Sequence, residues 1–126
     1  MSDEGSSRTG GRRSIAAADG STVRELAHPD WSSARGLSLA EAVVAPGEAT
    51  FLHRHGRSEE IYLFSAGSGR MTLGEAEFTV AAGDCVVIAP GTPHKLVNDG
   101  AEPLVLLCCC APAYSETDTE LLEPAS

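Results

Sequence analysis

The sequence GEATFLHRHGRSEEIYLFSAG, residues 47–67, decides the fold, together with GDCVVIAPGTPHKLVN at residues 83–98. Both stretches consist of short apolar runs that glycine and proline interrupt. Residues 60–64 alternate polar and apolar side chains, as expected for a strand with one buried face. The runs are too short for typical helices and have turn residues at their ends, so both stretches predict β-strands.

The same pattern continues on either side. Further apolar runs cover residues 37–45, 70–73, 77–80 and 104–110, with turn signals between them such as Gly74-Glu75. Many short strands separated by turns predict an all-β antiparallel barrel or sandwich. The exception is SETDTELL, residues 115–122, which predicts a short helix with Ser115 as its N-cap.

Length and charge restrict the classes of protein that fit. The chain has 126 residues, which suits one domain, and a formal net charge of −9. This charge argues against nucleic acid and membrane surfaces as partners. No apolar run approaches the roughly 20 residues of a membrane-spanning helix, and no signal peptide is visible, so we expect a cytoplasmic protein. The preference for Arg over Lys, with many Ala and Gly residues, suggests a GC-rich bacterial gene.

We predict three parts: a disordered polar tail at 1–14, a barrel at 15–112, and an acidic tail or short helix at 113–126. Adjacent cysteines on a strand point to opposite faces, so Cys108, Cys109 and Cys110 fit no disulfide framework. We interpret them as small buried side chains in a reducing compartment. Either Cys108 and Cys110 face inward, or Cys109 does.

Four residues predict a metal site. His53 and His55 are two positions apart on an extended segment, so their side chains leave the same face of one strand. Glu60 begins the next strand, and His94 begins a later one after Pro90-Gly91-Thr92-Pro93. Three imidazoles and one carboxylate that converge inside a barrel would form a mixed nitrogen and oxygen site for a first-row divalent metal.

The same residues carry a family resemblance. The spacing Gly47-(5)-His53-x-His55-(4)-Glu60-(6)-Gly67 resembles the first cupin motif, and Gly83-(10)-His94-(3)-Asn98 resembles the second. One position departs from the pattern, since Ala89 stands where the second motif usually has proline. The motifs cover residues 47–98, and the flanking strands extend the resemblance to about 37–112.

The resemblance to small single-domain cupins implies a double-stranded β-helix, or jelly roll. It also implies one divalent metal ion held by His53, His55, Glu60 and His94, which leaves two positions open on an octahedral metal. Fe, Mn, Ni, Cu and Zn all suit these ligands.

Strand alternation predicts which side chains surround the site. Tyr62 and Phe64 share the face of Glu60, and Phe51 shares that of the two histidines, so these aromatics would line an apolar pocket. The Tyr62 hydroxyl is a candidate donor to a substrate and the leading candidate catalytic group; Glu59 and His28 are the other candidates for an acid or base. Barrel packing is the alternative role for all three. Lys95 points outward by the same parity.

Three classes of function remain open, because this family hosts many chemistries. The first is a metal-dependent enzyme, most readily a mononuclear non-haem dioxygenase, acting on an apolar or aromatic small molecule. The second is a non-redox isomerase or cyclase, such as one of a natural-product pathway, in which the metal acts as a Lewis acid. The third is a cupin that binds a small ligand or metal without turnover.

We also expect a homodimer, since pairing would cover exposed sheet edges. Residues 15–34, which include Trp31, are a candidate for a strand that crosses to the partner.

Overall fold

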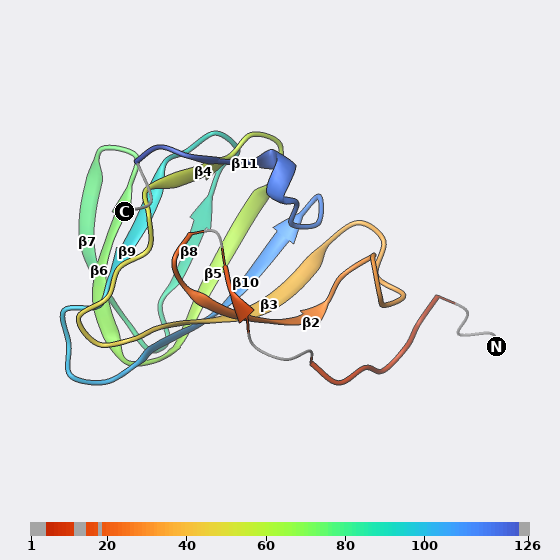
Figure 1. The fold of residues 1–126 in the computed structure, drawn as a ribbon, viewed down its shortest axis with the longest axis horizontal. Helices are drawn as coiled ribbons and strands as arrows, with labels where there is room; N and C mark the ends of the chain where they lie inside the picture. Colours follow the sequence, from red (N-terminus) through yellow and green to blue (C-terminus); the bar gives the residue numbers. More distant parts are fainter. Residues whose placement is uncertain (1–4, 12–14, 18, 124–126) are drawn as a thin grey trace.

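The computed structural model describes residues 5–11, 15–17 and 19–123, and these form two antiparallel sheets facing each other (Figure 1). The six-stranded sheet has the order β1-β2-β3-β10-β5-β8, and the five-stranded sheet has the order β11-β4-β9-β6-β7. The strands are β1 (Ile15–Ala16), β2 (Thr22–Ala27), β3 (Ser38–Val44), β4 (His53–His55), β5 (Glu59–Ala66), β6 (Ser68–Leu73), β7 (Ala76–Ala81), β8 (Cys85–Ile88), β9 (His94–Val97), β10 (Leu104–Ala111) and β11 (Thr119–Leu121). The predicted all-β jelly roll is confirmed.

The core lies between the inner faces of the two sheets. Along β5, buried and exposed side chains alternate, so Tyr62 and Phe64 point inward while Ile61 and Leu63 point out. This alternation follows from the two-residue period of a strand. The apolar core consists of Ala42, Val44, Tyr62, Phe64, Met71, Val80, Val86, Ile88, Leu96, Leu104 and Leu106.

Two glycines fix the turns around β6. Gly74 has a φ of +59° and starts the two-residue turn Gly74-Glu75 between β6 and β7, as the sequence predicted. Gly67 has a φ of +80°, and a Cβ at this position would lie 2.3 Å from the carbonyl oxygen of Pro103. Only glycine therefore allows β5 to pass into β6 so close to the start of β10.

The C-terminal segment corrects one prediction. The expected helix at 115–122 is a single 3₁₀ turn, Glu116–Asp118, followed by β11, which pairs with β4. The reason lies in the carboxylates: Asp118 accepts the backbone N–H groups of Arg57 and Ser58, and Glu120 pairs with Arg54 at 2.6 Å. The acidic segment thus extends the barrel to residue 121 rather than forming a separate tail.

At the other end, β1 forms the edge of the six-stranded sheet by pairing with β2, which in turn lies beside β3 of the same chain (Figure 1). The crossing of residues 15–34 to a partner subunit stays a prediction. Residues 5–11 contain no helix or strand, and the rest of the tail predicted at 1–14, like residues 124–126 of the C-terminal segment, lies outside the described residues. In the part of the chain that the structure describes, no helix is long and apolar enough to cross a membrane.

Candidate metal centre

The predicted quartet converges inside the barrel. The ligand-type nitrogens of His53, His55 and His94 all lie within 4.8 Å of one another, and the three side chains are buried. Glu60 Oε1 lies 3.3 Å from His55 Nε2 and 3.2 Å from His94 Nε2. Two strands of the five-stranded sheet and one of the six-stranded sheet supply these residues, since β4 and β9 pair at His53 and His94 while β5 faces them with Glu60.

Hydrogen bonds orient all three imidazoles in the same way. The Nδ1 of His53 lies 2.8 Å from the carbonyl oxygen of Phe51, and that of His94 lies 2.9 Å from the carbonyl oxygen of Thr92. Carbonyls only accept, so both Nδ1 atoms carry the proton. These contacts leave each Nε2 with a lone pair that is directed at the site.

His55 also carries its proton on Nδ1, and the partner of this nitrogen comes from the C-terminal segment. Its Nδ1 lies 3.0 Å from the hydroxyl oxygen of Thr119, and this hydroxyl donates its hydrogen to the carbonyl oxygen of Ser115 at 2.9 Å. The hydroxyl therefore accepts the His55 Nδ1 proton. Partners that fix the Nδ1 proton in this way are typical of metal-binding histidines.

Some polar atoms of the cluster find no hydrogen-bond partner among the described residues. Among the described residues, Glu60 Oε1 and His94 Nε2 are buried polar atoms without any hydrogen-bond partner. Such atoms cost about 1–3 kcal/mol each unless something satisfies them. A divalent cation between the carboxylate oxygen and the nitrogen lone pairs would satisfy both, so the residues fit the metal that the motifs imply.

The pKa values agree with ligands in their metal-binding protonation states. Burial lowers the pKa of His53, and the neighbouring His94 lowers it further. Burial alone would raise the pKa of Glu60, but the imidazoles of His55 and His94 outweigh it and bring the pKa down to about 2. Near neutral pH the site therefore holds a charged carboxylate and a neutral His53, as metal binding requires.

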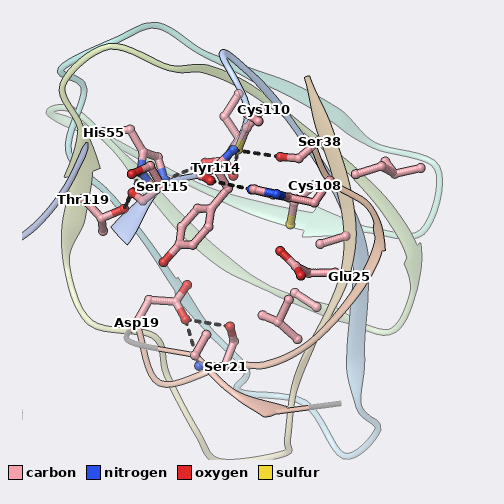
Figure 2. Close-up of a pocket in the computed structure, with 18 of the residues that line it drawn as sticks. Asp19, Ser21, Glu25, Ser38, His55, Cys108, Cys110, Tyr114, Ser115 and Thr119 are labelled. Carbon is pink, nitrogen blue, oxygen red and sulfur yellow. Dashed lines mark hydrogen bonds and ion pairs between the residues drawn. The ribbon is translucent and has the colours of Figure 1, made fainter. Parts of the chain in front are cut away.

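A cavity of about 630 Å³ leads to the cluster, and His53, His55 and Glu60 form part of its wall. Figure 2 shows the cavity side of the site, with Tyr114 between His55 and Asp19. The cavity lies mainly against the six-stranded sheet, whose apolar side chains Val23, Ala42, Val44 and Leu106 line it.

The structure corrects part of the predicted pocket. Tyr62 lines the cavity, and burial raises the pKa of its hydroxyl well above 10, so this group stays protonated. Phe64 points inward as predicted but lies in the core, and Phe51 packs near Gly20. Neither phenylalanine is part of the cavity wall. The N-terminal turn at Gly20 packs on Phe51, whereas Phe64 belongs to the apolar core between the sheets.

Of the three adjacent cysteines, which were expected to be buried, Cys110 is buried, while Cys108 and Cys109 are partly exposed. Cys108 and Cys110 face the cavity and all four cysteines are free; Cys110 Sγ donates to Glu60 Oε2 at 3.2 Å. Asn98 is fully buried and donates to the carbonyl oxygens of Val44 and Glu102, which holds two strand ends together. Lys95 points away from the site and pairs with Glu123.

Sequence reasoning missed two residues of the site. Asp19 approaches His53, with Oδ2 at 3.9 Å from Nε2, and the Tyr114 ring lies edge-on to His55 with 5.8 Å between centroids. Both lie outside the motifs, in segments where one sequence gives no periodicity to assign a face. The sequence offered one weak indication: Asp19 and Tyr114 each follow a run of small, mostly apolar residues.

Three inward imidazoles and a carboxylate beside a large cavity define a small metal-binding β-barrel. The chain belongs to the cupin family, since the model of the Cupin domain matches residues 40–110. This family assignment agrees with the motifs that span the two halves of the site.

Individual relatives support the assignment. An uncharacterized protein of Methanocaldococcus jannaschii, MJ1618, is 51% identical over 105 residues, which cover 83% of this chain and 84% of that protein. The oxalate decarboxylase of Lactobacillus farciminis superposes with a TM-score of 0.75 and 26% identity, over 88% of this chain and 33% of that one. A Cupin 2 conserved barrel domain protein of Salinispora arenicola gives a TM-score of 0.69 at 23% identity, over 79% and 81% of the two chains.

Proposed function

We propose that this cupin is a metal-dependent enzyme that acts on a small organic molecule, and that it is a mononuclear non-haem oxygenase. The observation that carries the proposal is that three members of the quartet, His53, His55 and Glu60, lie at the wall of a cavity of about 630 Å³. Ligand cavities typically measure about 300–1,000 Å³, so a small substrate would fit. Structural metal sites are usually closed, whereas catalytic ones keep a side open to substrate.

The residues of the chain have distinct roles in this proposal. His53, His55, His94 and Glu60 would hold the metal, which supplies Lewis acidity and, if it is redox-active, a place for dioxygen. The Nδ1 partners of the histidines keep each ring fixed, so the site is preorganised before the substrate enters.

The cavity wall supports an apolar or aromatic substrate. Apolar side chains cover the six-stranded sheet at this position, and burial keeps the Tyr62 hydroxyl protonated and available as a hydrogen-bond donor. The oxalate decarboxylase similarity concerns a protein of which this chain covers one third, so oxalate is not adopted as the substrate.

A non-redox isomerase or cyclase is the second candidate, and one observation favours it. The Asp19 carboxylate and the Tyr114 ring stand next to the histidines, on the cavity side of the quartet (Figure 2). Polar groups in this position can hold a substrate hydroxyl or carbonyl while a Lewis acid polarises it.

Elemental mass spectrometry of protein purified without chelator or affinity tag tests the proposal. The oxygenase predicts near-stoichiometric iron, and dioxygen uptake in an oxygen electrode when small aromatic compounds are added. Zinc, nickel or manganese without dioxygen uptake would favour the second candidate. No metal uptake, even after incubation with each ion, would refute a metal-dependent enzyme.

A further inference from the structure

The N-terminal segment carries an acidic residue to the metal centre. Asp19 lies between β1 and β2, and its carbonyl oxygen accepts the N–H of Phe51 at 2.6 Å. The next residue, Gly20, has a φ of +93° and sits against the carbonyl oxygen of Ala49, which a Cβ would approach to 3.3 Å. This turn is therefore seated directly on the segment that leads into β4.

The two carboxylate oxygens of Asp19 have different environments. Oδ1 accepts both hydrogens of Ser21, from the backbone N–H at 3.0 Å and from the hydroxyl at 2.6 Å. Oδ2 instead points toward His53 Nε2, at 3.9 Å, and the Asp19 side chain is only 20% exposed. Ser21 thus holds the carboxylate so that one oxygen stays available at the site.

The group that Oδ2 faces cannot donate a hydrogen. The proton of His53 is on Nδ1, which bonds to Phe51, so Nε2 presents a lone pair. Two electron-rich atoms facing each other are unfavourable unless a cation or a hydrogen lies between or beside them. Among the described residues, Glu60 Oε1 and His94 Nε2 likewise lack a hydrogen-bond partner, and their side chains are only 6% and 1% exposed. These two atoms also require a cation or a hydrogen beside them.

The charge of the cavity limits the ligands that would enter. Its wall contains five acidic residues, Asp19, Glu25, Asp30, Glu60 and Glu116, against one arginine, Arg35. Figure 2 shows Asp19 and Glu25 on either side of the open space near Tyr114. A divalent cation compensates for two of these charges, which leaves the cavity negative. Anionic groups such as carboxylates and phosphates are therefore repelled.

We propose that Asp19 makes this site selective for uncharged ligands that carry a hydroxyl group. Oδ2 accepts the hydrogen of a hydroxyl that reaches the metal from the cavity, and its negative charge rejects anionic ligands at the same position. The inference rests on the proposed metal-dependent function and names its substrate class: uncharged hydroxylated molecules rather than carboxylates or sugar phosphates.

The test compares two probes on Co(II)-loaded protein by visible absorption titration: cyclohexane-1,2-diol, which is uncharged and keeps its hydroxyl hydrogens, and oxalate, which is a dianion. Asp19→Asn removes the charge but keeps an oxygen for the two Ser21 hydrogen bonds. We expect the variant to bind oxalate about tenfold tighter, because one repelling charge is lost. It should bind the diol about fivefold more weakly, because an acceptor is lost.

Opposite shifts for the two probes separate this role from simple damage to the site, which would weaken both. Glu75→Gln is the matched control, since it removes one charge from the exposed turn between β6 and β7, outside the cavity wall, and should leave both affinities within about twofold. Asp19→Ala, a second variant, should also tighten oxalate binding.

Equal oxalate affinities in wild-type and Asp19→Asn protein, both loaded with Co(II), would overturn the role of Asp19 and leave the metal-dependent function intact. Failure of the wild-type protein to take up Co(II) or any other divalent metal would overturn both.

Discussion

Replacing Glu60 with glutamine should make the metal-free protein more stable while abolishing its response to metal. The carboxylate is buried, its Oε1 has no hydrogen-bond partner, and the same is true of His94 Nε2. A glutamine amide in this position would donate to the His94 lone pair, 3.2 Å away, while its oxygen could still accept from Cys110 Sγ.

The size of the effect follows from these contacts. Two buried atoms that lacked partners would form one hydrogen bond, and each such atom costs about 1–3 kcal/mol when unsatisfied. Removing a buried charge that has no cation acts in the same direction. We therefore expect the metal-free variant to gain about 2 kcal/mol of unfolding free energy at pH 8, where imidazoles with ordinary pKa values are neutral.

Added metal should stabilise the wild-type protein but not the Glu60→Gln variant. At a metal concentration about 100 times the dissociation constant, the wild-type protein gains about 2.7 kcal/mol, which corresponds to a rise in melting temperature of about 10 °C. The neutral amide is a poor replacement for a charged ligand, so the variant should show almost no rise.

Urea denaturation of chelator-treated protein and thermal melts with and without metal measure both quantities. Glu120→Gln is the control, because this carboxylate is exposed, lies on β11 beside the site and pairs with Arg54. It should behave like the wild type in both assays. A metal-free Glu60→Gln protein less stable than the wild type by 1 kcal/mol, or one that keeps the full metal response, would refute the reasoning.

Four further predictions test other parts of the structure. Because burial and His94 lower the pKa of His53, the unfolded chain takes up a proton more readily; the stability of metal-free protein should be complete above about pH 6.5 and fall below it, as measured by urea midpoints across pH. Asn98→Ala removes the three hydrogen bonds of a buried side chain and should cost about 3 kcal/mol in urea denaturation. His53→Ala should abolish metal occupancy, measured by elemental mass spectrometry, whereas Arg54→Ala should leave it unchanged. We further expect light scattering to give the mass of a homodimer, since large apolar side chains such as Ile61 and Val87 are exposed together on the outer face of the six-stranded sheet.

The sequence predicted the barrel from local patterns and the quartet from the resemblance to the two cupin motifs. The two-residue period of β5 placed Tyr62 and Phe64 on the inner face, and it is visible in residues 59–66 alone. His53, His55 and Glu60 are close in the sequence, but His94 comes much later, and no local pattern shows that it meets them. The alternation of a strand needs no knowledge of what packs against it, whereas the fourth ligand was placed by the family motif.

The pocket was harder to predict because it depends on distant segments. The alternation of side chains along a strand placed Phe51 and Phe64 on the same faces as the metal ligands. It contained no information on which other side chains would cover them. The N-terminal turn at Asp19 and Gly20 covers Phe51, and this contact joins residues about 30 positions apart. Such long-range packing has no signature in a single sequence.

The acidic C-terminal segment illustrates the same limit and shows its functional consequence. Its charges resemble those of a solvated tail, yet Asp118 and Glu123 accept backbone N–H groups on either side of β4 and so bring β11 alongside the strand of His53 and His55. Through Thr119 this segment then fixes the protonated nitrogen of His55. Residues from both ends of the chain therefore complete a site whose ligands come from the two central motifs. The motifs provide the metal ligands, and the terminal segments provide the groups that stand around them: Asp19 and Tyr114 beside the histidines, and Thr119 on His55.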